Sequence, residues 1–290
     1  MTAVRCVHPG ADLLGETPVW CPRTRAIWWI DIERPTLQRF DPATGRHEAH
    51  PIRARFLGSL ALRRAGGFLL ALDRALFTYD PERQALAPFC TVEPDDRDTR
   101  LNDGRCDGAG RFWVGTMDNG LAAPTGSFYR VDPDGTAHRA FGDVIVTNSV
   151  AVSPDQRTLY MSDTRRFVIW AFDLAADGTL SGRRVFADHT ATGDRPDGAC
   201  CDAEGYLWNA IFAGGRIVRH APDGRIERSV PLPVTNPTCV GFGGDRLETL
   251  YVTTARKFLT PAQLAAEPLA GALLAFEPGV RGLPEPMFAG

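Results

Sequence analysis

Lysine is almost absent from this chain of 290 residues, and Lys257 is the only one. The other basic residues are arginines, which excludes a lysine-rich membrane patch and leaves a single candidate for Schiff-base chemistry. The formal net charge of −3 gives no electrostatic reason to expect a nucleic acid as partner.

Long apolar runs and secretion signals are missing as well. No stretch of 18 apolar residues occurs, and the first ten residues lack the apolar run of a signal peptide. The seven cysteines are an odd number without a Cys-x-x-Cys pair, which argues against a zinc ribbon. We therefore expect a cytoplasmic protein with reduced cysteines that binds neither membranes nor nucleic acids.

Three familiar catalytic motifs are absent too. The chain contains no Gly-x-Ser-x-Gly and no His-Glu-x-x-His, so neither an α/β-hydrolase nucleophile nor a zinc-protease site is supported. The glycine-rich segment 241–244 lacks the lysine and the following helix of a phosphate-binding loop.

What the sequence does contain is a repeated strand-and-turn unit. It has 29 glycines, 22 prolines and 44% hydrophobic residues, a composition that favours many short strands around a core. A short apolar strand recurs at steps of 40, 44, 47, 48 and 43 residues. The central residues of these strands are Trp29, Leu69, Trp113, Tyr160, Trp208 and Tyr251.

Four strands in each period of about 40–50 residues are the unit of a β-propeller blade. We therefore predict an all-β fold, a six-bladed propeller of four-stranded antiparallel blades around a central channel, in a single domain over residues 1–290. The alternative is a β-sandwich, which gives no reason for six repeats. Residues 4–7 are expected to supply the outer strand of the last blade, and Thr260 is expected to cap a short helix over residues 261–266.

Polar residues recur at a fixed place ahead of these strands. Eleven to fifteen residues before each central residue stand Glu16, Gly58, Asn102, Asn148, Asp197 and Asn236. In a propeller the innermost strands converge, so these side chains are expected to meet at one mouth of the channel. Carboxylate and amide oxygens without His or Cys suit Ca²⁺, Mg²⁺, Mn²⁺ or Fe²⁺. The alternative for each residue is that it caps a strand end, although capping requires no common register.

The sequence resembles the senescence-marker protein/gluconolactonase family of six-bladed sugar lactonases, which includes regucalcin. The resemblance covers nearly the whole chain and rests on five motifs in order. These are Leu14-Gly15-Glu16-Thr17-Pro18-Val19-Trp20, Arg100-Leu101-Asn102-Asp103-Gly104, Gly115-Thr116-Met117, Thr147-Asn148 and Pro196-Asp197-Gly198. It implies that Glu16, Asn148 and Asp197 are metal ligands and that Arg100 and Asn102 contact the substrate. The chain departs from the family after Met117, where the acidic sugar contact is either absent or replaced by Asp118 or Asn119.

These residues predict a metal-dependent sugar lactonase, a hydrolase of carboxylic esters, which opens a pentono- or hexono-1,4- or 1,5-lactone to the aldonic acid. One divalent ion, Ca²⁺, Fe²⁺, Mn²⁺, Zn²⁺ or Mg²⁺, would polarise the carbonyl, with Asp197 as general base or hydroxide on the ion in its place. Arg100 and Asn102 would hold the sugar. Two alternatives stay open: an interaction scaffold without catalysis, and a metal-dependent arylesterase or phosphotriesterase.

Overall fold

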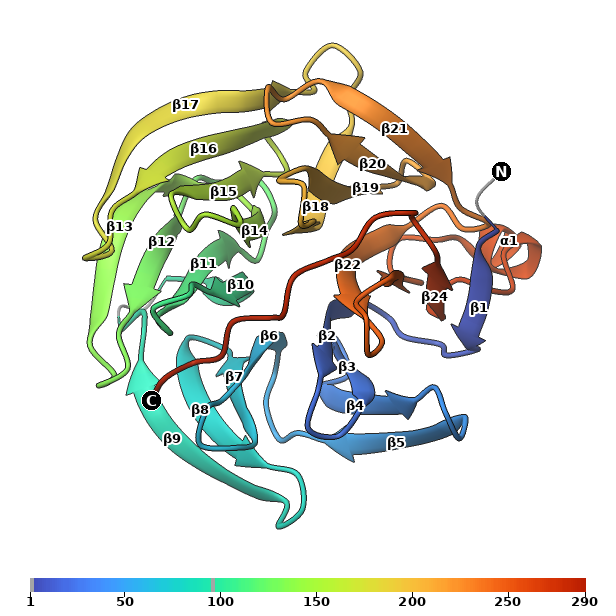
Figure 1. Cartoon of the computed structure of the whole chain (residues 1–290), viewed down its shortest axis with the longest axis horizontal. Helices are drawn as coiled ribbons and strands as arrows, with labels where there is room; N and C mark the ends of the chain where they lie inside the picture. Colours follow the sequence, from blue (N-terminus) through green and yellow to red (C-terminus); the bar gives the residue numbers. More distant parts are fainter. Residues whose placement is uncertain (1–2, 95–96) are drawn as a thin grey trace.

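Six four-stranded antiparallel sheets form a ring around a central axis (Figure 1). The computed structural model describes residues 3–94 and 97–290 of the chain. In five of the sheets the strands follow one another in sequence order, from the axis outward. The prediction of a six-bladed β-propeller is therefore confirmed, and the β-sandwich alternative is wrong.

The first three blades use consecutive strands. Blade 1 consists of β2 (Gly15–Cys21), β3 (Ala26–Asp31), β4 (Thr36–Asp41) and β5 (Arg46–Pro51). Blade 2 consists of β6 (Leu57–Leu62), β7 (Phe68–Leu72), β8 (Ala75–Asp80) and β9 (Ala85–Thr91). Blade 3 consists of β10 (Thr99–Cys106), β11 (Phe112–Asp118), β12 (Gly126–Val131) and β13 (Ala137–Val144).

The last three blades complete the ring. Blade 4 consists of β14 (Thr147–Val152), β15 (Thr158–Asp163), β16 (Val168–Leu174) and β17 (Leu180–Asp188). Blade 5 consists of β18 (Arg195–Cys201), β19 (Leu207–Phe212), β20 (Arg216–His220) and β21 (Ile226–Pro231). Blade 6 consists of β22 (Pro237–Gly243), β23 (Thr249–Thr254), β24 (Leu273–Phe276) and, outermost, β1 (Arg5–His8).

Strand β1 closes the ring, because the N-terminal strand pairs antiparallel with β24 near the C-terminus. Arg5 lies opposite Ala275, and Cys6 lies opposite Leu274. The expected closure by residues 4–7 is therefore correct, with a shift of one residue. The pairing covers an edge of β24 that would otherwise present unpaired backbone groups to solvent.

The apolar core lies between neighbouring blades. Each of the six recurring central residues lies in the second strand of its blade, and the tryptophans among them are at most 1% exposed. Burial of these large side chains stabilises the fold by roughly 1.5–3 kcal/mol each. The innermost strands are almost entirely buried, whereas the outermost strands consist mostly of exposed and half-buried residues.

The innermost strand of every blade is interrupted by a β-bulge in the first half of its length. The register with the second strand shifts after Glu16 in β2, after Leu101 in β10, after Asn148 in β14 and after Pro196 in β18. Equivalent shifts occur in β6 and β22. Bulges bend a strand and turn its side chains, so they direct polar residues here toward the axis.

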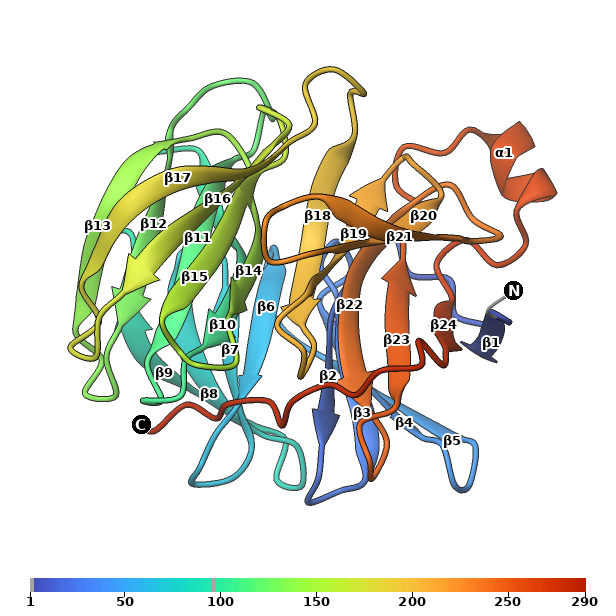
Figure 2. The ribbon, with the colours of Figure 1, turned by 45° about the horizontal axis from the view of Figure 1, so that its top comes forward.

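The C-terminal segment after β24 crosses the ring at the far ends of the innermost strands (Figures 1 and 2). The backbone of Phe288 pairs with Leu62 at the end of β6, and the backbone of Arg281 accepts from Ala203 just past β18. The side chain of Glu285 forms an ion pair with Arg105 in β10, with 2.7 Å between Oε2 and Nη1. This segment therefore covers one end of the channel. The polar residues beside the β-bulges lie at the other end.

The only helix found in residues 3–94 and 97–290 is α1 (Pro261–Ala266), and its start agrees with the prediction. Thr260 caps it and forms a capping box with Gln263. Within the same residues, no helix is long and apolar enough to cross a membrane. All seven cysteines are described, and none of them forms a disulfide.

Candidate active site

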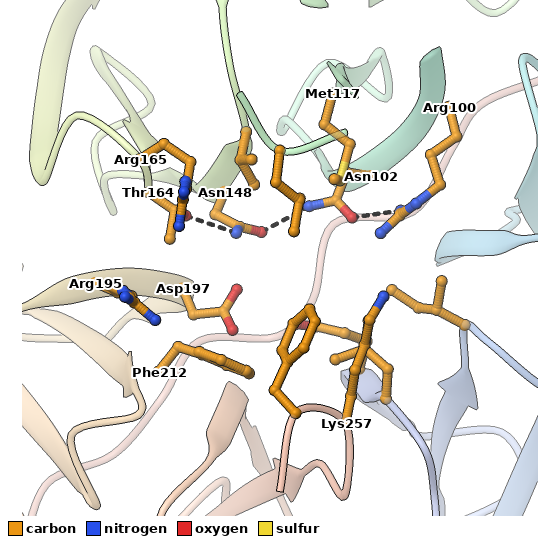
Figure 3. Close-up of a pocket in the computed structure, with 16 residues that line it drawn as sticks. Arg100, Asn102, Met117, Asn148, Thr164, Arg165, Arg195, Asp197, Phe212 and Lys257 are labelled. Atoms are coloured by element: carbon orange, nitrogen blue, oxygen red, sulfur yellow. Dashed lines mark hydrogen bonds between the residues drawn. The ribbon is translucent and has the colours of Figure 1, made fainter. Parts of the chain in front are cut away.

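The five predicted site residues line one pocket at the open end of the channel (Figure 3). The pocket encloses about 640 Å³ of empty space, part of it open to solvent. These residues are Glu16, Arg100, Asn102, Asn148 and Asp197, and each is only 4–6% exposed. They come from β2, β10, β14 and β18, so the register prediction brings together residues from four blades.

A chain of hydrogen bonds fixes the amide side chains across blades 3, 4 and 5 (Figure 3). Nη1 of Arg100 donates to Oδ1 of Asn102 at 2.6 Å, and Nδ2 of Asn102 donates to Oδ1 of Asn148 at 2.9 Å. Nδ2 of Asn148 donates to Oγ1 of Thr164 at 2.8 Å, and that hydroxyl donates to the carbonyl of Pro196 at 2.7 Å. The orientation of each amide is set by its partners, and both amide oxygens keep one lone pair.

The two carboxylates at the site oppose each other electrostatically. Burial raises the pKa of Asp197 well above its usual value, and the negative charge of Glu16 raises it further. Burial likewise raises the pKa of Glu16, with a further increase from Asp103. Burial lowers the pKa of Arg100 to about 10, so its guanidinium remains charged at neutral pH. A bound cation would stabilise the ionised form of both carboxylates.

The donor atoms suit a hard divalent cation. The backbone N–H of Thr17 donates to Oε2 of Glu16, whereas the carboxylate of Asp197 accepts no bond from any described side chain. The carboxylates of Glu16 and Asp197 and the amide oxygen of Asn148 together provide three oxygen ligands. This set leaves coordination positions for water and substrate. Among residues 3–94 and 97–290 no cluster of three or more His, Cys, Asp or Glu could hold a metal, so a site here depends on the amide.

The backbone around Asp197 is held in place by its neighbours. Oγ of Ser149 and Nδ2 of Asn209 both donate to the carbonyl oxygen of Asp197, at 2.5 and 2.8 Å. Ser149 itself has a positive φ of 54°, directly after Asn148, and Thr17 has a φ of 49°, directly after Glu16. These left-handed residues belong to the bulges, which orient the preceding side chains.

Two residues of the predicted register do not contribute side chains to the pocket. Gly58 has no side chain, and a Cβ there would lie 2.3 Å from the carbonyl oxygen of Leu101. Asn236 lies just before β22, where its Nδ2 donates to the carbonyl of Lys257 at 2.9 Å. It supports a residue of the pocket wall and does not line the pocket itself.

The two candidates for the missing acidic sugar contact already form hydrogen bonds with neighbouring residues of the protein. The carboxylate of Asp118 accepts from the backbone N–H groups of Ala122 and Ala123, each at 2.9 Å. Asn119 donates to Asp98 at 2.7 Å. Neither residue lines the pocket, and Leu121 from the same loop does.

Sequence reasoning missed two arginines of the pocket wall, Arg165 and Arg195 (Figure 3). A signal for Arg195 was available: it stands two residues before Asp197, as Arg100 stands two residues before Asn102. Arg165 lies in the turn after β15, outside the repeated register. Lys257, the single lysine of the chain, lines the pocket and forms an ion pair with Glu33.

Known proteins resemble this chain in sequence and in fold. The chain is 38% identical over 288 residues to the 6-deoxy-6-sulfogluconolactonase of Pseudomonas putida, with 99% of each chain covered. It is 36% identical to the L-arabinolactonase of Azospirillum brasilense, over 96% of this chain and 93% of the relative. The crystal structure of the calcium-binding protein regucalcin from Agrobacterium tumefaciens superposes with a TM-score of 0.94 at 32% identity, covering 100% and 98% of the two chains.

The match extends to the family level, and its span includes all five of these pocket residues. The sequence model of the SMP-30/gluconolactonase/LRE-like region matches residues 14–256, from the start of blade 1 to the end of β23. Relatives named as lactonases are hydrolases of carboxylic esters, which is the enzyme class predicted. The chain belongs to the SMP-30/gluconolactonase/LRE-like family, which includes sugar lactonases.

Proposed function

We propose that this protein is a metal-dependent sugar lactonase that hydrolyses an aldono-lactone to the aldonic acid. The observation that carries the proposal is the pairing of two buried carboxylates with an amide oxygen at the base of a pocket whose wall holds Arg100 and Asn102. The names of two relatives, a sulfogluconolactonase and an arabinolactonase, support the substrate class.

Glu16, Asn148 and Asp197 would hold the ion, and the name of one related structure as a calcium-binding protein supports a divalent cation. A bound divalent ion would act as a Lewis acid toward the lactone carbonyl. The two carboxylates would then face a positive charge, which removes the repulsion that raises both of their pKa values. Three ligands from three strands leave the donor set rigid, because each strand is bonded to its neighbours.

Asp197 serves as the general base in this proposal. Its carboxylate takes a proton from a water molecule as the water oxygen attacks the carbonyl carbon. The bond between the carbonyl carbon and the ring oxygen then breaks, and the proton passes from Asp197 to that oxygen. The product is an open-chain aldonic acid, and the carboxylate of Asp197 is restored.

Arg100 and Asn102 position the substrate. Nη1 of Arg100 is engaged by Asn102 and by the carbonyl of Leu101, and its other N–H groups have no partner among the described residues. They are available for sugar hydroxyls and for the negative charge that develops on the carbonyl. The guanidinium also lies 5.2 Å from the ring centroid of Phe56, which restricts its movement.

The test combines a variant with a lactone panel and a metal panel. We expect Asp197→Asn to lower kcat for glucono-, xylono- and arabinono-lactones by about 100-fold or more, measured by pH-stat. The same variant should lose the rise in melting temperature that Ca²⁺ or Mn²⁺ gives the wild type. Asp177→Asn, in an exposed turn, is the matched control and should behave as wild type.

Three outcomes would contradict the proposal. Full activity of Asp197→Asn would remove its role as base, and full activity after chelation would remove the metal. Turnover of paraoxon without turnover of any lactone would favour the phosphotriesterase alternative.

A further inference from the structure

Four cationic side chains line the pocket, which is more than the proposed lactonase reaction uses. They are Arg100, Arg165, Arg195 and Lys257. Arg100 faces the negative charges of Glu33, Glu16 and Asp197, and Lys257 is paired with Glu33. These two cations are therefore compensated within the protein.

Arg165 and Arg195 are not compensated. Among the residues that the structure describes, neither guanidinium lies within 4.0 Å of a carboxylate, and neither donates a hydrogen bond. The charged residues next to them in sequence do form ion pairs: Arg166 pairs with Asp143, and Asp194 pairs with Arg216. Two adjacent positions thus keep their charge free at the pocket, while the arginines around them are paired.

The backbone brings these two arginines to the same side of the pocket. The hydroxyl of Thr164 donates to the carbonyl of Pro196 at 2.7 Å, so the residues next to Arg165 and Arg195 are bonded to each other. Figure 3 shows Arg165 and Arg195 on one side of the pocket and Arg100 on the other, with Asp197 and Asn148 between. A substrate that spans the pocket therefore has its reacting carbonyl at the carboxylates and its far end at the two arginines.

We propose that Arg165 and Arg195 form a subsite for an oxyanion carried by the substrate, so that the preferred lactone bears a phosphate or sulfonate group remote from the carbonyl. This inference rests on the proposed function for the position of the carbonyl. Guanidinium groups bind such tetrahedral anions with two parallel N–H bonds each. Two free arginines would neutralise a phosphate monoester, which carries about −2, and would more than neutralise the single charge of a sulfonate. The half-buried position of Arg195 strengthens the attraction relative to open solvent.

The experiment compares kcat/KM for three lactones: glucono-1,5-lactone, its 6-phosphate and its 6-deoxy-6-sulfo analogue. We expect the wild type to favour at least one anionic lactone by about tenfold or more. In R165Q/R195Q the ratio of anionic to neutral kcat/KM should fall about tenfold or more, chiefly through KM. R183Q/R184Q removes two positive charges from β17, on the outside of blade 4, and should keep both the activity and the ratio.

The two anionic arms identify the group. Preference for the phosphate lactone alone assigns a phosphate subsite, and preference for the sulfo lactone alone assigns a sulfonate subsite. Equal rates for all three lactones in the wild type, or an equal loss for all three in R165Q/R195Q, would overturn the inference. An equal loss would mean that the arginines contact groups common to all three sugars.

A binding measurement separates this inference from the proposed function. Calorimetry with 6-phosphogluconate and with gluconate requires no turnover. Tighter binding of 6-phosphogluconate that is lost in R165Q/R195Q supports the subsite even if no lactone is hydrolysed, in which case only the lactonase proposal fails. Hydrolysis of lactones together with equal binding of both acids would leave the lactonase proposal and overturn the subsite.

Discussion

Gly58 in β6 shows how closely the innermost strands approach one another. An added Cβ would lie 2.3 Å from the carbonyl oxygen of Leu101 and 3.2 Å from the backbone nitrogen of Asn102. A real side chain there must push β10 away from the axis, and Asn102 moves with it.

We predict that Gly58→Ala lowers the free energy of unfolding by about 1–3 kcal/mol because of this overpacking. It should also reduce lactone turnover, since the bond between Asn102 and Asn148 depends on the position of β10. Urea unfolding and a turnover assay measure the two effects. Ser59→Ala in the same strand removes a buried hydroxyl that has no partner and is the control. Wild-type stability of Gly58→Ala would contradict the prediction.

His220 makes stability depend on pH. It is fully buried, its Nδ1–H donates to the carbonyl of Gly224 at 3.0 Å, and its Nε2 has no partner among the described residues. Burial lowers the pKa of His220 to about 4, below its usual 6.5. Below pH 6.5 the unfolded chain gains a proton that the folded chain does not take up.

The free energy of unfolding should therefore fall between pH 6.5 and 4, by up to about 3 kcal/mol from this residue. Urea unfolding at pH 7.5 and pH 5 tests this. The difference between the two pH values should shrink in His220→Gln and stay as in wild type in His138→Gln, whose ring is exposed. An unchanged difference in His220→Gln would exclude His220 as the cause.

At the scale of the element, a buried aspartate closes the hairpin between β18 and β19. Asp202 accepts from the indole N–H of Trp208 at 2.9 Å and from Nε of Arg219 at 2.8 Å. Its other oxygen accepts from the backbone N–H groups of Glu204 and Tyr206. One carboxylate thus joins a turn, the second strand of the blade and the third.

Asp202→Ala should cost about 3–5 kcal/mol, because it leaves the buried guanidinium of Arg219 without this partner. Thermal and urea unfolding measure the loss. Asp223→Ala, in the exposed turn that follows β20, removes a carboxylate of the same kind and should leave the free energy of unfolding nearly unchanged. Equal losses in the two variants would show that burial does not decide the effect.

Elements that belong to the repeat, or that carry a local signal of their own, were predictable from the sequence. Elements with neither were not. The central residues of the six second strands, the closure by β1 and the helix capped by Thr260 all have local signals. The convergence of Glu16, Asn102, Asn148 and Asp197 followed from the repeat alone, although their chemical roles stay predictions.

What failed has physical reasons. The offset of Asn236 is larger than the others, and the residue lies ahead of the bulge in β22, so its side chain points at the Lys257 carbonyl. Arg165 lies in a turn whose length varies between blades, which a periodic pattern cannot place. The course of the C-terminal segment occurs once, so no repeat predicts it.

At the scale of the whole molecule, stability depends on a closed ring. Deletion of residues 1–8 removes β1 and exposes the outer edge of β24. We expect this deletion to lower the melting temperature and to promote aggregation through the open edge. Calorimetry and light scattering measure the two effects.

Deletion of residues 1–3 leaves β1 complete and is the control. If the longer deletion melts and scatters light as the control does, then the closure by β1 contributes nothing to stability.

The pairing of β1 with β24 also has a consequence for the time order of synthesis. Arg5 is synthesised 270 residues ahead of its partner Ala275. The first five blades can assemble while translation continues, whereas β1 stays unpaired until β24 has been synthesised. Premature termination anywhere before β24 therefore yields a propeller whose last blade cannot pair with β1. Such truncated products should be substrates for chaperones and proteases.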